Sequence, residues 1–135
     1  MKLVADANVL LSALIGGRAR LILKHPTVEE ILTAEATFAE VQEYGGELAR
    51  QKRLRLDSML LAIAALPVTI VERNLFAAKI PEARRRIGRR DPDDVEILAL
   101  ALQVQFPLWS NDNDFADAGV EWYTTAELLQ KLGSS

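Results

Sequence analysis

Cysteine is absent from the 135 residues of this chain, and histidine occurs only once. The absence of cysteine excludes disulfides, thiolate metal sites and thiol nucleophiles, and it agrees with a reducing compartment. The one histidine, His25, is followed by Pro26 and is interpreted as a loop residue. Any chemistry of this chain therefore depends on other functional groups.

Long apolar runs are also missing from the chain. The apolar residues 3–5 are followed at once by Asp6, and no run approaches the length of a membrane span or of a signal segment. We therefore expect a cytoplasmic protein that makes no membrane contact. Half of the residues are hydrophobic and 26% are charged, which is typical of globular proteins, and we expect residues 1–135 to form a single domain.

Positive charge is not in excess, since the net charge is −3 and the pI is near 5.2. This balance argues against a general nucleic-acid binder, because phosphate backbones favour clustered cations. The cations nevertheless form two clusters, which could steer a polyanion to an acidic centre or could simply be solvated helix faces. The candidate residues for contact with such a polyanion are Arg53, Arg55, Arg85, Arg86, Arg89 and Arg90.

Short apolar runs alternate with helical patterns along the chain. Strands are predicted at residues 2–5, 31–34, 68–71, 107–110 and 120–123. Helices are predicted at residues 9–15, 18–24, 37–53, 57–66 and 73–87, from residue 91 onward, and after residue 124. Because strands alternate with helices, the sequence predicts an α/β fold, a three-layer α/β/α sandwich with a central, mostly parallel sheet of about five strands.

Several local signals refine these predicted helices. Gly45 and the glycine after it weaken the helix at 37–53 in its middle. Asp57 is expected to cap the next helix, and Pro81 predicts a break in the helix at 73–87. Thr124 and Glu127 have the spacing of a capping box at the start of the last helix.

Four acidic residues fall where an open parallel sheet places its ligands, at the carboxyl ends of the strands. Asp6 follows the first predicted strand and Asp112 follows the fourth. Asp94 lies in the first turn of the helix that leads into the fourth strand, and Glu40 lies about one turn into the helix after the second strand. We therefore expect these four carboxylates to converge at one edge of the sheet.

Carboxylates so close together would repel one another and raise each other's pKa, unless they share a cation. Mg²⁺ and Mn²⁺ prefer carboxylate and water oxygens, and the absence of cysteine with a single histidine disfavours zinc. Two such ions can activate a water and stabilise the departing oxygen when a phosphodiester is cleaved. Phosphoryl chemistry is therefore the natural use of the predicted cluster.

Four segments resemble the acidic motifs of the PIN-domain family, a group of metal-dependent ribonucleases that includes toxins of toxin–antitoxin pairs. In chain order they are residues 4–10 (VADANVL), 37–41 (TFAEV), 91–101 (DPDDVEILALA) and 109–115 (WSNDNDF). Each motif by itself is unspecific, but the ordered set of four extends along nearly the whole chain.

This resemblance implies a Mg²⁺- or Mn²⁺-dependent endoribonuclease that leaves a 3′-hydroxyl and a 5′-phosphate. It implies the metal ligands Asp6, Glu40, Asp94 and Asp112, with Asn8 as a positioning hydrogen-bonder and Asp114 as an auxiliary ligand. It also implies an RNA substrate, for which the six arginines named above are the candidate RNA-binding residues, and an antitoxin protein or a second copy of the chain as partner.

Structural roles for the same acids stay open at this point. Asp6 could be a turn residue between a strand and a helix. A helix start with Asp91 as N-cap, proline at the next position and acids in the first turn fully accounts for Asp91 and Asp93. It also explains Asp94, so the metal role of Asp94 rests on the resemblance. Two other functions stay open as well: a catalytically silent PIN-like module that binds RNA or protein, and a metal-dependent phosphatase with Asp6 as nucleophile.

Overall fold

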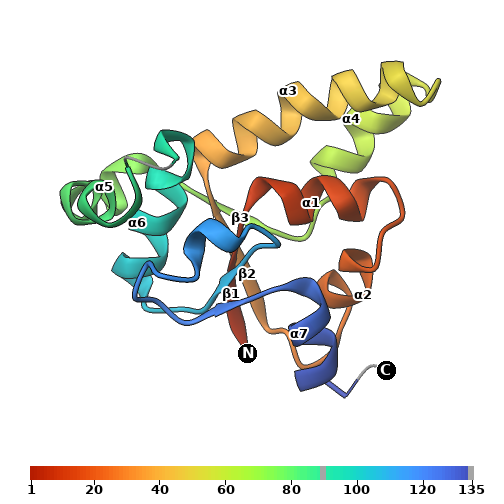
Figure 1. The fold of residues 1–135 in the computed structure, drawn as a ribbon. Helices are drawn as coiled ribbons and strands as arrows, with labels where there is room; N and C mark the ends of the chain where they lie inside the picture. The colour runs from red at the N-terminus through yellow and green to blue at the C-terminus, as the bar shows by residue number, and fades with distance from the viewer. Residues whose placement is uncertain (89–90, 134–135) are drawn as a thin grey trace.

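The sheet determines the architecture of this chain, which is described for residues 1–88 and 91–133 in a computed structural model (Figure 1). Five strands, all parallel to their neighbours, lie in the order β3-β2-β1-β4-β5. Their bounds are β1 Lys2–Ala5, β2 Glu30–Ala34, β3 Thr69–Val71, β4 Leu108–Trp109 and β5 Trp122–Tyr123. The predicted α/β fold with a parallel sheet of about five strands is confirmed.

Helices cover both faces of the sheet, because successive side chains of a strand point to opposite faces. Leu3 and Ala5 of β1 pack into one buried cluster, whereas Val4 packs into the other. The first cluster includes residues of α1 (Ala7–Leu14), α2 (Ala19–Leu23), α3 (Glu35–Gln51), α4 (Leu56–Ala64) and α7 (Thr125–Lys131). The second includes residues of α5 (Ile80–Ile87) and α6 (Val95–Val104).

The longest helix, α3, runs unbroken through Gly45, which the sequence predicted would weaken it. A Cβ at Gly45 would lie 2.7 Å from Cδ1 of Ile63 in α4. The missing side chain therefore allows α4 to pack closely against α3. The two helices form a hairpin that extends beyond the sheet (Figure 1).

Two local predictions were wrong. Asp57 does not cap α4, because Arg55 is the N-cap residue and Asp57 lies in the first turn, where its carboxylate accepts a hydrogen bond from the Ser58 N–H. Pro81 does not break a helix, because it lies in the first turn of α5, where the missing N–H costs little. The residues before α5 form the short 3₁₀ turns Arg73–Leu75 and Ala77–Lys79 instead.

The helix predicted from residue 91 onward begins with a 3₁₀ turn, Pro92–Asp94, which continues into α6. The predicted capping box of α7 is confirmed, since the Glu127 N–H donates to the Thr124 hydroxyl and the Thr124 N–H donates to the Glu127 carboxylate. Within the described part of the chain, no helix is long and apolar enough to span a membrane.

Candidate metal centre

Asp6 lies where β1 ends and α1 begins, and it is buried. Its Oδ1 accepts a hydrogen bond of 2.8 Å from the Ala7 N–H, so it caps α1. Its Oδ2 accepts hydrogen bonds from the Ser110 hydroxyl at 2.8 Å and from the Asn8 amide at 3.1 Å. One oxygen of Asp6 therefore caps a helix, as a turn residue would, while the other takes part in a polar network with Ser110 and Asn8.

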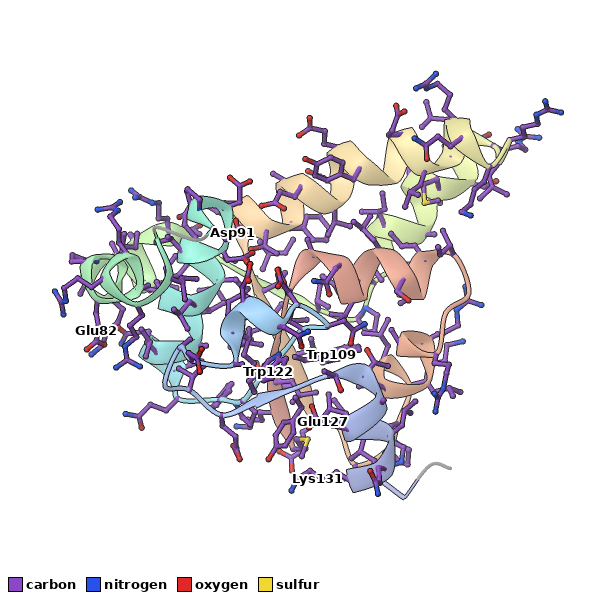
Figure 2. The ribbon with its side chains drawn as sticks, viewed as in Figure 1. Glu82, Asp91, Trp109, Trp122, Glu127 and Lys131 are labelled. Atoms are coloured by element: carbon purple, nitrogen blue, oxygen red, sulfur yellow. The ribbon has the colours of Figure 1, made fainter. Side chains whose placement is uncertain are left out.

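Ser110, which was not singled out from the sequence, joins the ends of β1 and β4. It is fully buried, and its hydroxyl donates to Asp6 and accepts from the Asn8 amide at 3.2 Å and from the Asp112 N–H at 3.0 Å. The carbonyl of Ser110 accepts a hydrogen bond from the indole of Trp122, one of the two tryptophans labelled in Figure 2. The signal that could have indicated Ser110 was its position at the end of the predicted fourth strand, where a parallel sheet places its ligand-binding residues.

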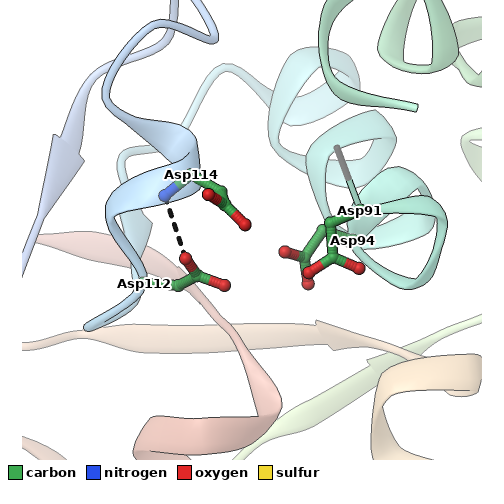
Figure 3. Close-up of side chains that lie close together, drawn as sticks. All are labelled: Asp91, Asp94, Asp112 and Asp114. Atoms are coloured by element: carbon green, nitrogen blue, oxygen red, sulfur yellow. Dashed lines mark hydrogen bonds between the residues drawn. The ribbon is translucent and has the colours of Figure 1, made fainter. Parts of the chain in front are cut away.

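Four carboxylates gather beside this network: Asp91, Asp94, Asp112 and Asp114, each of which offers one oxygen within 4.8 Å of the others. Asp91 and Asp94 come from the turn before α6, and they face the other two across a gap in Figure 3. Asp112 and Asp114 come from the connection between β4 and β5, where Oδ1 of Asp112 accepts from the Asp114 N–H at 2.9 Å. This set is called the acidic cluster below.

Asp91 is the member of the acidic cluster that the sequence did not predict. Its side chain accepts a hydrogen bond from the Asp93 N–H at 3.1 Å, so the predicted N-cap role is confirmed. The same carboxyl group nevertheless faces Asp94, Asp112 and Asp114. A residue with a complete local explanation can therefore also take part in a site formed by distant segments.

A buried oxygen of Asp94 tests whether these residues fit a divalent cation. Within the described residues, Asp94 Oδ2 has no hydrogen-bond partner, although an unpaired buried polar atom is costly. Burial, followed by the adjacent carboxyl of Asp91, raises the pKa of Asp94 to about 9. Because Mg²⁺ and Mn²⁺ favour carboxylate oxygens and remove such repulsion, the residues present fit a divalent cation of this type.

Asp6 and Glu40 lie close enough to these acids to respond to their charges. Burial raises the pKa of Asp6, against the opposing effect of its hydrogen bonds, and the charges of Asp112 and Asp91 raise it further. Burial also raises the pKa of Glu40 to about 7, with further contributions from Asp6, Asp93 and Asp91. Neither Asp6 nor Glu40 belongs to the acidic cluster itself. Their response to its charges places them beside it, Asp6 between β1 and α1 and Glu40 in α3.

The predicted RNA-binding arginines lie in two separate regions. Arg53 and Arg55 follow α3, whose 17 residues place them roughly 25 Å from the sheet edge at 1.5 Å per residue. Arg55 is paired with Asp57 at 2.7 Å. Arg85 is exposed on α5, whereas Arg86 donates hydrogen bonds to the backbone of residues 118–119. Arg89 and Arg90 lie outside the described residues, and RNA contact by all six arginines stays a prediction.

A parallel α/β domain with an acidic cluster at the carboxyl ends of its strands defines a candidate metal-dependent phosphoryl enzyme. The sequence profile of the PIN domain matches residues 4–133. This chain therefore belongs to the PIN-domain family, as the sequence motifs predicted. No protein with curated annotation matches it.

Solved structures share the fold at low sequence identity. VapBC2 from Rickettsia felis, bound to a DNA fragment from its promoter, aligns with a TM-score of 0.69 at 15% identity over 92% of this chain and 98% of that chain. A toxin–antitoxin complex from Klebsiella pneumoniae aligns with a TM-score of 0.66 at 21% identity over 90% and 96%. VapC20 from Mycobacterium tuberculosis, a sarcin–ricin loop cleaving toxin, aligns with a TM-score of 0.58 at 17% identity over 87% and 95%.

Proposed function

We propose that this chain is a Mg²⁺- or Mn²⁺-dependent endoribonuclease that acts as the toxin of a toxin–antitoxin pair. The observation that carries the proposal is the acidic cluster, in which a buried oxygen of Asp94 lacks a hydrogen-bond partner among the described residues. Membership of the PIN-domain family supports a nuclease. The activity named for the VapC20 structure supports RNA as the substrate class.

In this proposal the residues at the sheet edge divide into ligands and supports. Asp94, Asp112, Asp6 and Glu40 bind the ions together with Asp91, and Asp114 is an auxiliary ligand. Ser110 and Asn8 hold the Asp6 carboxylate in one orientation through their hydrogen bonds. Such fixed partners of ligating groups are a general requirement of metal sites.

The proposed reaction is hydrolysis of an RNA phosphodiester. Bound at the acidic cluster, Mg²⁺ or Mn²⁺ supplies Lewis-acid stabilisation and a lowered pKa of the attacking water. Water attacks the phosphorus and the 3′ oxygen departs, so the products carry a 3′-hydroxyl and a 5′-phosphate. The carboxylates would hold the cations, which balance the charge of the carboxylates and of the scissile phosphate, and one proton of the attacking water ends on the departing 3′ oxygen.

A phosphatase that uses Asp6 as a nucleophile has less support than a nuclease. The Asp6 carboxylate is held in one orientation by hydrogen bonds from Ala7, Ser110 and Asn8, which suit a ligand and a nucleophile alike. Position 8, however, carries asparagine and offers no second aspartate for such a phosphatase. Membership of the PIN-domain family therefore favours the nuclease.

Cleavage of RNA by the purified chain in Mn²⁺ tests the proposal directly. We expect Asp94→Asn and Asp6→Asn to abolish cleavage, because each removes a charge at the proposed centre. Asp57→Asn is the matched control, since Asp57 is also a first-turn acid but is exposed on α4 and paired with Arg55. Calorimetry that detects no Mn²⁺ or Mg²⁺ binding would instead support a silent RNA- or protein-binding module.

The toxin role is tested by expression in a bacterial host. We expect the wild-type chain to arrest growth and the Asp94→Asn variant to permit it, because only the first retains the complete acidic cluster. Equal growth of the two strains, at equal protein level, would remove the toxin role while leaving the nuclease to be judged by the cleavage assay.

An antitoxin partner is the further part of this proposal. Leu56, Leu60 and Leu61 on α4 are 55%, 50% and 72% exposed, which makes an apolar surface on one helix. The antitoxin complexes among the similar structures support an antitoxin as its occupant. The alternative occupant is a second copy of the chain, and light scattering would identify it as a dimer of the chain alone that Leu61→Glu converts to a monomer.

A further inference from the structure

Among the predicted RNA-binding arginines that the structure describes, Arg86 is the one whose guanidinium is directed at the protein's own backbone. Its Nη1 donates to the carbonyl oxygens of Ala118 at 2.7 Å and Gly119 at 3.2 Å. Its Nη2 lies 3.5 Å from Glu82 Oε1, one turn earlier on α5. Figure 2 shows Glu82 on this outer helix. Arg86 therefore ties α5 to the connection between β4 and β5.

That connection carries half of the acidic cluster on little regular structure. Residues 110–121 join two strands of two residues each, and they contain one 3₁₀ turn, Asn113–Phe115, with Asp112 as its N-cap. The buried side chains of Phe115 and Ala118 hold the middle of the connection against the second core cluster. The hydrogen bonds of Arg86 hold the carbonyl groups of Ala118 and Gly119.

Gly119 provides an independent sign that this contact is specific. Its φ is +75°, a conformation that residues with a side chain rarely adopt. A Cβ built at Gly119 would lie 2.7 Å from Nη1 of Arg86, which is closer than real contacts allow. Both the positive φ and the close approach of the Arg86 guanidinium therefore favour glycine at position 119.

We propose that Arg86 is a positioning residue for the acidic cluster. Its guanidinium fixes the end of the β4–β5 connection against α5 and so restricts the positions that Asp112 and Asp114 can take. That Arg86 holds the β4–β5 connection in place is inferred from its hydrogen bonds alone. That it thereby strengthens cation binding rests on the proposed function. Lysine cannot replace arginine fully, because its one nitrogen takes the place of two separate ones: Nη1 bonds the two carbonyls while Nη2 faces Glu82.

Hydrogen–deuterium exchange of the whole chain in EDTA tests the first effect. We expect Arg86→Ala to speed exchange of the amides of residues 112–119 about tenfold, as local opening becomes easier, with unchanged exchange in β1 and β2. Arg84→Ala is the matched control, an exposed arginine on the same helix for which we expect wild-type exchange. Unchanged exchange at residues 112–119 in Arg86→Ala would overturn the proposal.

Calorimetric titration with Mn²⁺ tests the second effect. We expect about a fivefold loss of affinity in Arg86→Ala, below the roughly 10- to 100-fold typical of direct partners of metal ligands, and an intermediate loss in Arg86→Lys. Faster exchange with unchanged Mn²⁺ affinity would overturn the positioning role. If the wild-type chain binds no divalent ion, the proposed function fails, and exchange still decides whether Arg86 holds the connection.

If Arg86→Ala fails to fold, Arg86→Lys keeps the proposal testable, since we expect it to speed exchange at residues 112–119 to a smaller extent and unchanged exchange would overturn the proposal. Where Arg86→Ala folds, Gly119→Ala gives a further test. The added Cβ displaces the guanidinium in the wild-type background but meets no guanidinium in Arg86→Ala. The two substitutions should therefore be less than additive in their effect on exchange at residues 112–119. Full additivity would show that the two residues act separately and would contradict the proposed contact.

Discussion

Asp94→Asn should make the metal-free protein more stable while it removes the proposed function. The wild-type carboxyl is 8% exposed and has an oxygen without a hydrogen-bond partner among the described residues. Burial and the neighbouring carboxyl of Asp91 raise its pKa from the ordinary value of 3.8 to about 9. The folded state therefore binds a proton at pH 7 that the unfolded state releases.

The size of this effect follows from linkage. Each pKa unit corresponds to about 1.4 kcal/mol. At pH 7 only the interval between the ordinary pKa of 3.8 and the solution pH contributes, so the cost to folding is at most roughly 4 kcal/mol. Because the acids of the cluster share this cost, we expect Asp94→Asn to recover about 2 kcal/mol. Asparagine keeps the shape of the side chain, and its amide can donate to Asp91 where the protonated acid would.

The sign of the pH dependence gives a second check. A carboxyl group whose pKa is raised on folding destabilises the protein above its ordinary pKa, so wild-type stability should fall as pH rises from about 4 toward 9. Below pH 4 both states are protonated, and the advantage of Asp94→Asn should vanish. Urea unfolding in EDTA at several pH values, followed by the fluorescence of Trp109 and Trp122, measures both effects.

Addition of Mn²⁺ should reverse the order of stability. A cation present at 100 times its Kd stabilises the folded state by about 2.7 kcal/mol, and the variant should gain little of this. Two results would refute the reasoning: a variant that is less stable than wild type in EDTA at pH 7, or equal stabilisation of both proteins by Mn²⁺. Asp57→Asn, at an exposed and ion-paired position, should show neither the gain in EDTA nor the loss of Mn²⁺ response.

Three further predictions follow from the same network. Ser110→Ala removes a hydroxyl that makes three hydrogen bonds, one of them to a buried carboxylate. We expect it to lower the free energy of unfolding in urea by about 2–3 kcal/mol and to weaken Mn²⁺ binding about tenfold. Ser58→Ala on α4 is the exposed control. Glu40→Gln should flatten the fall in metal-free stability between pH 4.5 and about 7, because the raised pKa of Glu40 is removed. Asp57→Asn should not, because Arg55 lowers the pKa of Asp57 below this interval. Phe115→Ala should cost about 3–5 kcal/mol, since the ring is fully buried beside the acidic cluster, and wild-type stability would contradict the packing role given to the β4–β5 connection.

Much of the fold was predictable because its signals are local. The alternation of apolar runs with helical patterns gave the five strands in order, since burial on both faces of a parallel sheet selects short apolar runs. The capping box of α7 was predictable because both partners lie within one turn of each other. Asp57 failed as a cap because Arg55 already adopts the extended N-cap conformation two positions earlier, which sequence preference alone does not reveal.

The candidate site was predictable only in part. Asp6, Glu40, Asp94 and Asp112 were named from strand ends and family motifs, and the structure brings two of them into the acidic cluster and places the other two beside it. Asp91 was missed because its N-cap hydrogen bond gave a sufficient local explanation. Ser110 was missed because a single serine after a strand is unremarkable until its three partners are known.

The sequence by itself determined the order of the elements and the residue types available for chemistry, because these depend on neighbours within a few positions. Only the tertiary structure decided which carboxylates meet, which oxygen lacks a partner, and which arginine is turned toward the protein. Arg86 shows the difference, since its partner Ala118 lies 32 positions along the chain. Distances between such segments are fixed by how the helices pack on the sheet, and no local pattern encodes them.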